Sequence, residues 1–434
     1  MSPVALGLVG LCVMLVLLFA RLPVGIVMFM VGIAGFGVLT NVAATFEMVS
    51  TTAYGTAADY GLTVIPMFVL MGEIAFRAGV SRDLYKASHT WFGHVSGGLA
   101  MASVVACAGF AALCGSSVAG AATMSTVAIP EMKKYGYAPS LRTAVIAAGG
   151  TLGILIPPSV GFVLYGTLTN VSISQMFIAG ILPGIFLAIV FCGVVYLHVK
   201  MRPSLAPGTF ERTSLRSKVS SLGLVADTAI IFALVMGGLF AGIFTPTESG
   251  AMGAFLTLVL ALIRRRIDLQ KIVEALKGTA VITGMVFLIT MGAMVFSRFL
   301  ALSGVPTAAA EWIGDMAVDR YLVLVLILVL YLILGALLDT LAMILLTIPI
   351  FFPIVTAMGF DEIWFGVVVV IMAEVGLITP PVGMNAFVIA GANPDVELGD
   401  IFRGVWPFVG AMIFVVAVLV AFPGIATVLP GLMR

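Results

Sequence analysis

One acid, Asp339, interrupts the long apolar segment from Tyr321 to Thr356. A carboxylate in apolar surroundings is costly unless it is paired or binds a cation. Thr340 follows directly, so a carboxylate and a hydroxyl break the segment together. Oxygen ligands of this kind suit a hard cation such as sodium, and Asp339 is therefore the strongest single candidate for an ion-binding residue.

A second apolar segment, residues 97–132, is interrupted at Gly115, Ser116 and Ser117. Each interrupted segment is followed by a glycine-containing run that ends in two prolines, Pro157-Pro158 after the first and Pro380-Pro381 after the second. Prolines remove backbone donors and expose carbonyl oxygens, and glycines allow a helix to unwind. The pattern indicates ion binding by carbonyls and hydroxyls; the alternative is a proline kink with small residues for close helix packing.

The two sets of features repeat at a constant offset of 223 residues, as from Pro157 to Pro380. The repeat predicts two units, residues 1–210 and 222–434. Because Ser116 is equivalent to Asp339, the two ion sites should differ in charge. The equivalent pairs are Pro23 and Pro246, Ser117 and Thr340, Gly136 and Gly359, Gly153 and Gly376, Pro158 and Pro381, and Asn170 and Asn393.

The elements that position these residues must lie in a membrane. The chain has 434 residues, of which 62% are hydrophobic and 9% charged, whereas soluble proteins have about 25% charged residues. This composition excludes a soluble enzyme and predicts an all-α polytopic protein in a lipid bilayer. The uniform run 321–338 does not alternate as a membrane β-barrel strand does. The net charge of +1 gives no reason to expect a nucleic-acid partner.

Ten segments are long enough to cross a bilayer. Segments 97–132 and 321–356 instead divide at their polar breaks into halves of about 15 residues, which is short for a crossing. We expect each to be a re-entrant helical hairpin; the alternative is two short, tightly turned transmembrane helices. The ten crossing segments are 3–20, 23–39, 61–77, 142–168, 174–198, 222–244, 247–263, 279–300, 364–391 and 402–428.

The distribution of basic residues tests this topology. With the N-terminus outside, every Lys and Arg except Arg298, Arg320 and Arg434 falls on the cytoplasmic side. Both termini are then periplasmic. Five crossings separate equivalent positions, so the two repeats are inverted, which together with interrupted helices is the architecture of secondary transporters.

Other polar residues have simpler interpretations. Glu374 is a second acid in an apolar segment, for which the alternative to ion binding is a bond to a neighbouring helix. Glu73 and Arg77 have the spacing of a local ion pair, and Thr245 with Glu248 has that of a helix start. The sequence has no Gly-Lys-Ser/Thr triplet for ATP and no nucleophile, His or metal-ligand set at membrane depth, so we expect neither an enzyme nor a cofactor.

Four ordered motifs carry a resemblance that covers nearly the whole chain. The sequence resembles the large membrane (M) subunit of a tripartite ATP-independent periplasmic (TRAP) transporter, a member of the ion transporter superfamily. The motifs are Gly115-Ser116-Ser117-Val118-Ala119, Gly153-Ile154-Leu155-Ile156-Pro157-Pro158-Ser159, Phe244-Thr245-Pro246-Thr247-Glu248-Ser249-Gly250-Ala251, and Gly376-Leu377-Ile378-Thr379-Pro380-Pro381-Val382-Gly383-Met384-Asn385.

The resemblance implies a sodium-coupled elevator mechanism in the bacterial inner membrane. A transport domain holding both hairpins would slide against a scaffold domain, the two being interleaved along the chain. The implied partners are a small four-helix membrane subunit and a periplasmic substrate-binding protein that delivers an organic acid. The solute would be of the sialic acid or C4-dicarboxylate type, although the sequence does not identify it.

The resemblance also implies roles for residues at the breaks. One sodium site would use Ser116 and Ser117 with an unwound stretch from Gly149 to Gly153. The other would use Asp339, Thr340, Gly376, Thr379 and Met384. The solute would lie between the hairpin tips, and the residues implied to contact it are Ser117, Pro158, Thr340 and Asn385.

Two other functions remain open from the sequence. One is a sodium/carboxylate symporter that works alone, without a binding protein or a small subunit. The other is an ion channel, since paired re-entrant segments with polar tips also describe pores.

Overall fold

The computed structural model describes residues 2–20, 22–206, 213–315 and 319–433. Within these ranges the secondary structure is helical and contains no strand. Helices α1 to α10 are Pro3–Phe19, Val24–Leu39, Val42–Ala57, Val64–Arg77, Val80–Phe92, Gly98–Cys114, Ser117–Lys134, Pro139–Leu155, Val160–Thr169 and Ile173–Met201, with the 3-10 turns η1 (Gly61–Thr63) and η2 (Pro203–Leu205).

The second half of the chain begins with α11. Helices α11 to α20 are Leu215–Phe240, Pro246–Ile263, Leu269–Ser303, Val305–Asp315, Arg320–Gly335, Thr340–Ala357, Glu362–Ile378, Met384–Ala392, Leu398–Ala421 and Gly424–Gly431. By length and composition, six helices in the described residues can each cross a membrane, or up to eight spans if each of two bent pairs counts as one. The predicted all-α polytopic membrane fold is confirmed.

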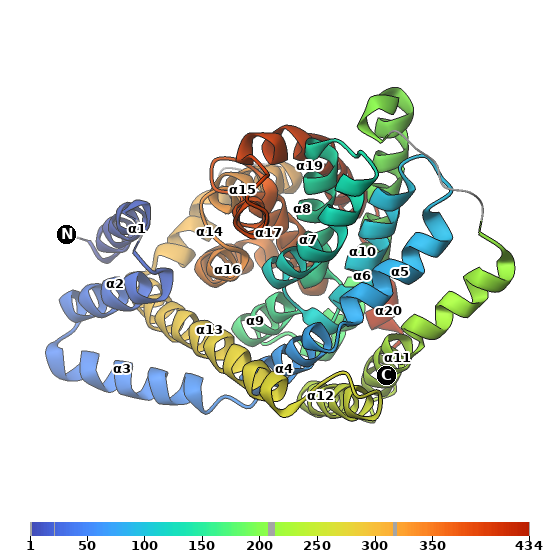
Figure 1. The fold of residues 1–434 in the computed structure, drawn as a ribbon. Coiled ribbons are helices and arrows are strands. Elements are labelled where there is room, and N and C mark those ends of the chain that lie inside the picture. The colour runs from blue at the N-terminus through green and yellow to red at the C-terminus, as the bar shows by residue number, and fades with distance from the viewer. Residues whose placement is uncertain (1, 21, 207–212, 316–318, 434) are drawn as a thin grey trace.

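The helices form two packing groups (Figure 1). In the first group, α2 lies along α13, and α4 packs against both α12 and α13. The second group contains α6 to α10 and α15 to α20, with α8 and α17 at its centre. Helix α5 packs on α6 and α7 of the second group, on α4 of the first group and on α11, and so contacts both groups.

Small residues allow α2 and α13 to approach closely. A Cβ on Gly292 would lie 2.2 Å from the carbonyl oxygen of Gly25. A Cβ on Gly32 would lie 2.8 Å from the backbone nitrogen of Phe296. Backbone contact through glycine is a common way to join membrane helices, where burial of apolar surface adds little.

The core lies around α8 and α17. Every residue of α8 from Leu141 to Leu155 is buried, as is every residue of α17 from Trp364 to Ile378. A helix that is apolar on all sides is expected in such a position. Glu374 lies in the buried part of α17, which makes it an exceptional residue in the core.

Helices in the two halves share their bounds at the offset of 223 residues. Helix α7 corresponds to α16 at both ends, and α8 corresponds to α17. Gly136 and Gly359, which are equivalent, both have positive φ, of 75° and 77°. Both Pro-Pro bonds are cis. The division at residues 210 and 222 into inverted repeats stays a prediction, with which these bounds agree.

The structure differs from the expected helices at several points. The segment 142–168 is two helices, α8 and α9, separated by the Pro157-Pro158 pair, and α5 and α14 were not expected. The stretch from Gly149 to Gly153, expected to be unwound, lies within α8, because the glycines keep their helical hydrogen bonding and the helix ends only before the prolines.

Helix α3 was not expected, because its Thr- and Ser-rich sequence lacks an apolar run; Asn41 caps it by accepting from the backbone of Ala44. The segment 364–391 is two helices, α17 and α18, separated by the Pro380-Pro381 pair. The segment 402–428 is likewise divided into α19 and α20 at Phe422 and Pro423.

Candidate functional site

The first polar break joins α6 to α7. Gly115 ends α6 in the left-handed conformation, with φ of 65°, which glycine adopts without strain. Ser116 then caps α7, its hydroxyl accepting from the backbone nitrogen of Ala119 at 3.4 Å. Ser117 is the first residue of α7 and is buried.

The second break joins α15 to α16 in the same manner. Asp339 caps α16, and its Oδ1 accepts from the backbone nitrogens of Leu341 and Ala342, both at 3.0 Å. An aspartate is among the best N-cap residues, and its charge is favourable at a helix N-terminus. The cap therefore gives Asp339 a structural role through Oδ1, in addition to any role in binding an ion.

The two breaks meet at Glu374. Its carboxylate is 0% exposed. Oε2 accepts a hydrogen bond from the Ser117 hydroxyl at 2.5 Å, and Oε1 accepts one from the Thr340 hydroxyl at 2.8 Å. One carboxylate in the core thus joins the first residue of α7 to the first residue of α16.

The sequence leaves two interpretations open for Glu374, namely ion binding and a bond to a neighbouring helix. The structure shows bonds to the tips of both interrupted segments. The signal present in the sequence was an acid within an otherwise apolar run, at the position equivalent to Thr151. Thr151 instead donates to Ala148 O in its own helix at 2.6 Å.

Two equivalent glycines bring the helices that follow against the breaks. A Cβ on Gly153 would lie 2.7 Å from the carbonyl oxygen of Ser116. A Cβ on Gly376 would lie 2.2 Å from the carbonyl carbon of Gly335, at the end of α15. The structure therefore places Gly153 and Gly376 against the breaks; their role as sodium ligands stays a prediction.

The remaining residues implied for sodium lie at different distances from the breaks. The Thr379 hydroxyl is buried and donates to Gly376 O at 3.1 Å. Gly149 faces α6, where a Cβ would lie 2.7 Å from Cys107 Sγ, and Gly150 faces the Ser117 carbonyl instead. Met384 begins α18 and is 40% exposed.

The residues implied for the solute surround the same region. The carbonyl oxygen of Pro158 lies 2.9 Å from a Cβ placed on Gly115. Asn385 is 0% exposed, and its Nδ2 donates to Ala147 O in α8 at 3.1 Å. Its Oδ1 is buried and has no hydrogen-bond partner. A buried acceptor without a donor is costly, so Asn385 is suited to a ligand that can donate.

Charged residues at the other end of α7 join the two halves again. Lys133 Nζ lies 2.5 Å from Asp395 Oδ2 in the α18–α19 loop, and Arg142 of α8 lies 3.6 Å from the same oxygen. The hydrogen bond from Lys133 lowers the pKa of Asp395. The pair stabilises the position of this loop against α7 and α8.

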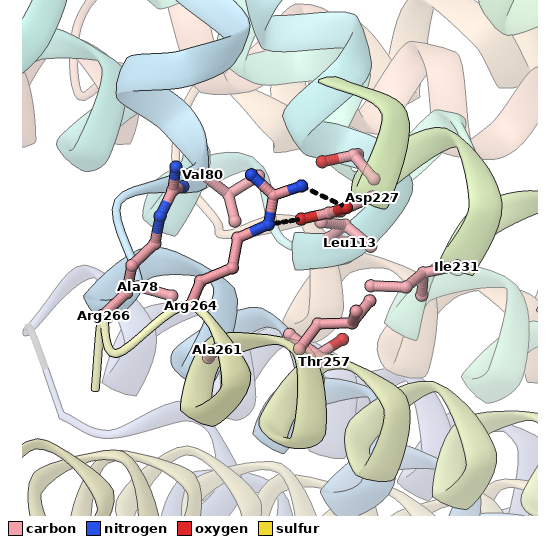
Figure 2. Close-up of a pocket in the computed structure, with 11 residues that line it drawn as sticks. Ala78, Val80, Leu113, Asp227, Ile231, Thr257, Ala261, Arg264 and Arg266 are labelled. Atoms are coloured by element: carbon pink, nitrogen blue, oxygen red, sulfur yellow. Dashed lines mark hydrogen bonds and ion pairs between the residues drawn. The ribbon is translucent and has the colours of Figure 1, made fainter. Parts of the chain in front are cut away.

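Figure 2 shows a cavity elsewhere in the molecule, between the α4–α5 junction, α11 and α12. Arg264 there makes two contacts with Asp227, with nitrogen–oxygen distances of 2.6 and 2.8 Å. The cavity has a volume of about 30 Å³, which is about the volume of one water in the liquid. It is too small for an organic solute and contains none of the predicted site residues.

Comparison with known proteins identifies the family. The family model described as "Tripartite ATP-independent periplasmic transporter, DctM component" matches residues 11–425. The C4-dicarboxylate TRAP transporter large permease protein DctM of Pseudomonas aeruginosa is 33% identical over 87% of this chain and 88% of that protein. The sialic acid TRAP transporter large permease protein SiaM of Vibrio cholerae is 31% identical over 96% of each chain.

Two further similarities concern substrate range and fold. The ectoine/5-hydroxyectoine TRAP transporter large permease protein UehC of Ruegeria pomeroyi is 29% identical over 96% of this chain and 97% of that protein. The structure of the YdaH transporter of Alcanivorax borkumensis has a TM-score of 0.62 at 15% identity, over 89% of this chain and 90% of that one, which shows a shared fold. The chain belongs to the family of DctM components, the large permease subunits of tripartite ATP-independent periplasmic transporters.

Proposed function

We propose that this permease subunit couples the sodium gradient to the import of an organic solute that carries a carboxylate, across the bacterial inner membrane. The names of several relatives give C4-dicarboxylates, sialic acid and ectoine, which each carry a carboxylate, whereas one relative is named for isethionate, a sulfonate. The carboxylate common to the solutes of DctM, SiaM and UehC supports the solute class, and sialic acid or a C4-dicarboxylate is the type we favour.

One observation carries the proposal: Ser117 and Thr340 both donate to the buried carboxylate of Glu374. A buried negative charge with hydroxyl oxygens beside it is favourable for a cation and otherwise costly. Its position between the two breaks supports sodium binding beside each tip. Sodium is the coupling ion in this mechanism, and no resident cofactor is proposed.

The sodium ligands proposed for the first site are Ser116, Ser117, Gly149 and Gly153. Those for the second are Asp339, Thr340, Gly376, Thr379 and Met384. The close backbone contacts of Gly153 with Ser116 and of Gly376 with Gly335 support this grouping, because they bring carbonyl oxygens to each break. For Asp339, the cap bonds engage Oδ1, and we propose Oδ2 as the ion ligand.

The solute is proposed to lie between the tips, near Ser117, Pro158, Thr340 and Asn385. The unpaired Asn385 Oδ1 supports a solute that offers a hydrogen-bond donor on this side. The Ser117 and Thr340 hydroxyls could donate to a solute carboxylate only by releasing Glu374. Exchange of these two hydroxyls between Glu374 and the solute would link ion binding to solute binding without covalent chemistry.

The proposal includes two protein partners and an orientation. A small four-helix membrane subunit would enlarge the scaffold, and a periplasmic binding protein would deliver the solute; the name of the family, tripartite, supports three components. The excess of Lys and Arg in the loops assigned to the cytoplasm supports periplasmic termini. The two packing groups support an elevator in which the group around α8 and α17 moves against the group around α13.

Uptake by proteoliposomes tests the proposal. The chain is reconstituted with its small membrane subunit, and uptake of labelled acids is measured with the binding protein and an inward sodium gradient. Saturable uptake that needs the gradient is expected, and Asp339→Asn should abolish its sodium dependence.

Three controls separate this function from its alternatives. Uptake by the chain alone would favour a stand-alone symporter. Single-channel currents would favour a pore. Sodium-independent uptake by the complete complex would overturn the coupling proposal.

A further inference from the structure

A cavity of about 450 Å³ lies between α5 and the far end of α7, away from the two breaks. Its volume is in the range of small-molecule sites. The residues that line it include Arg82, Tyr85, Lys86 and His89 of α5 and Thr126 and Glu131 of α7. Thr126 is nine residues along α7 from Ser117, about 13 Å at 1.5 Å per residue, so the cavity is separate from the proposed solute site.

The charges in this cavity are arranged on opposite walls. Arg82 and Lys86 lie one turn apart on α5, and Glu131 lies on α7. None of these three takes part in the ion pairs made by the described residues. The cavity therefore presents two cations on one wall and a carboxylate on the other, without the cations and the acid neutralising each other directly.

Two aromatic groups complete the α5 wall. Tyr85 is 4% exposed, and its hydroxyl, near Ser103, makes no hydrogen bond of acceptable geometry. Burial raises the pKa of Tyr85, so its hydroxyl keeps its proton and adds no charge to this wall. His89 stacks on Tyr85 with 6.5 Å between ring centroids, and burial lowers its pKa, so His89 adds no charge near pH 7.

The position of α5 fits the boundary between membrane and water. The helix is not among the apolar spans, and its polar residues distinguish it from the helices around it. Trp91 near its end is 39% exposed, and Lys218 Nζ lies 5.7 Å from the ring centroid. Tryptophan is enriched at membrane interfaces, and basic pockets between helices on the cytoplasmic side bind phospholipid headgroups.

We propose that this cavity binds the headgroup of a phospholipid that carries both a phosphate and a primary amine, as phosphatidylethanolamine does. Arg82 and Lys86 receive the phosphate. Glu131 receives the ammonium group. Because residues of both α5 and α7 line the cavity, a bound lipid would contact α5 and also α7, the helix that starts at Ser117. The proposal does not depend on the transported solute.

Lipid binding to the purified full-length chain, with its membrane partner, tests the proposal. Native mass spectrometry compares phosphatidylethanolamine, phosphatidylglycerol and phosphatidylcholine with identical acyl chains. Phosphatidylethanolamine should bind more tightly than the other two by about fivefold, the ratio expected from about one net hydrogen bond. Equal or tighter binding of phosphatidylglycerol would overturn the proposal, and this comparison needs no variant.

Variants assign the two walls. The double variant Arg82→Gln/Lys86→Gln should weaken all three lipids by roughly tenfold or more. Glu131→Gln should remove the preference for phosphatidylethanolamine over phosphatidylglycerol and leave phosphatidylglycerol binding intact. The control Arg216→Gln/Lys277→Gln makes the same charge change at exposed positions outside the cavity. It should change neither the affinity for the three lipids nor the preference for phosphatidylethanolamine. Equal weakening of lipid binding in this control would contradict the assignment of Arg82 and Lys86 to the phosphate.

Soluble competitors distinguish the source of the phosphate. Displacement of the lipid by phosphoethanolamine, and not by inorganic phosphate at the same concentration, supports recognition of the whole headgroup. Equal displacement by inorganic phosphate would indicate a simple anion site and would overturn the proposal.

Discussion

Ser117 and Thr340, which begin equivalent helices in the two halves of the chain, donate hydrogen bonds to opposite oxygens of one carboxylate, that of Glu374. The two tips therefore share an acceptor that the second half supplies both to its own tip and to the tip of the first half. A ligand that draws one hydroxyl away changes the acceptor available to the other. If the proposed ion and solute sites lie at these tips, this exchange couples them, and the coupling is reciprocal.

A double-mutant cycle measures this sharing. Ser117→Ala and Thr340→Ala should each destabilise the protein by about 1–3 kcal/mol, because a buried carboxylate oxygen loses its donor. The double variant should depart from the sum of the two by about 0.5 kcal/mol or more, since both act on one group. Unfolding in detergent micelles measures both quantities. Thr167→Ala, which removes a bond within one helix, is the control, and strict additivity would argue against sharing.

The charge of Glu374 should matter for transport. Glu374→Gln keeps the size of the side chain but removes the negative charge, so we expect sodium-driven uptake to fall by at least about tenfold, equivalent to the loss of about 1.4 kcal/mol of ion binding. Glu362→Gln makes the same change at an exposed position on the same helix and should leave uptake unchanged. If the Glu374→Gln variant takes up solute at the wild-type rate at limiting sodium, the charge of Glu374 is not used in sodium coupling.

The sequence predicted local features well. The Glu73–Arg77 ion pair is confirmed. The helix start at Thr245 is confirmed as a capping box, in which Glu248 accepts from the Thr245 backbone at 2.8 Å. These features depend on residues three or four positions apart, so their spacing along the chain contains the information needed to predict them.

The partners of Glu374 were beyond what the sequence could predict. Ser117 and Glu374 are separated by 257 residues, and their contact exists because α7, α16 and α17 pack together. The sequence identified both breaks and the buried acid but not that they meet. The role of Asp339 as a helix cap, by contrast, has a signal in the sequence, because an aspartate before an apolar run is a recognised helix start.

Substitutions of Asp339 should separate its role as a helix cap from its proposed role as a sodium ligand. Asp339→Ser keeps an N-cap, as its equivalent Ser116 does in the first half, so stability should change by less than about 1 kcal/mol. Asp339→Ala loses the cap and should cost about 1 kcal/mol. If Oδ2 binds sodium, both variants lose sodium-dependent uptake. Thermal unfolding and sodium titration of uptake measure the two effects, and full sodium dependence in Asp339→Ser would limit this residue to the cap.

The Lys133–Asp395 pair predicts a pH dependence. The hydrogen bond from Lys133 lowers the folded-state pKa of Asp395, so its contribution to stability is present above the unfolded pKa of about 3.9 and is lost as pH falls through the lower folded value. Asp395→Asn should therefore lower the unfolding temperature at pH 7 and have progressively less effect in acid. Glu397→Gln, at an exposed neighbouring position, is the control. If Asp395→Asn lowers the unfolding temperature by the same amount at every pH, the ionised carboxylate of Asp395 does not stabilise the fold.

The contact between Gly335 and Gly376 predicts a severe effect for a single methyl group. A Cβ on Gly376 would lie 2.2 Å from backbone atoms of Gly335, and backbone moves less easily than a flexible side chain. Gly376→Ala should thus destabilise the protein by about 3 kcal/mol or more and separate the end of α15 from α17. Gly391→Ala in α18, where a Cβ meets nothing within 4 Å, should instead be neutral or stabilising by up to about 1 kcal/mol. Unfolding temperatures of the two purified variants make the comparison, and equal values would show that α15 and α17 can separate at low cost.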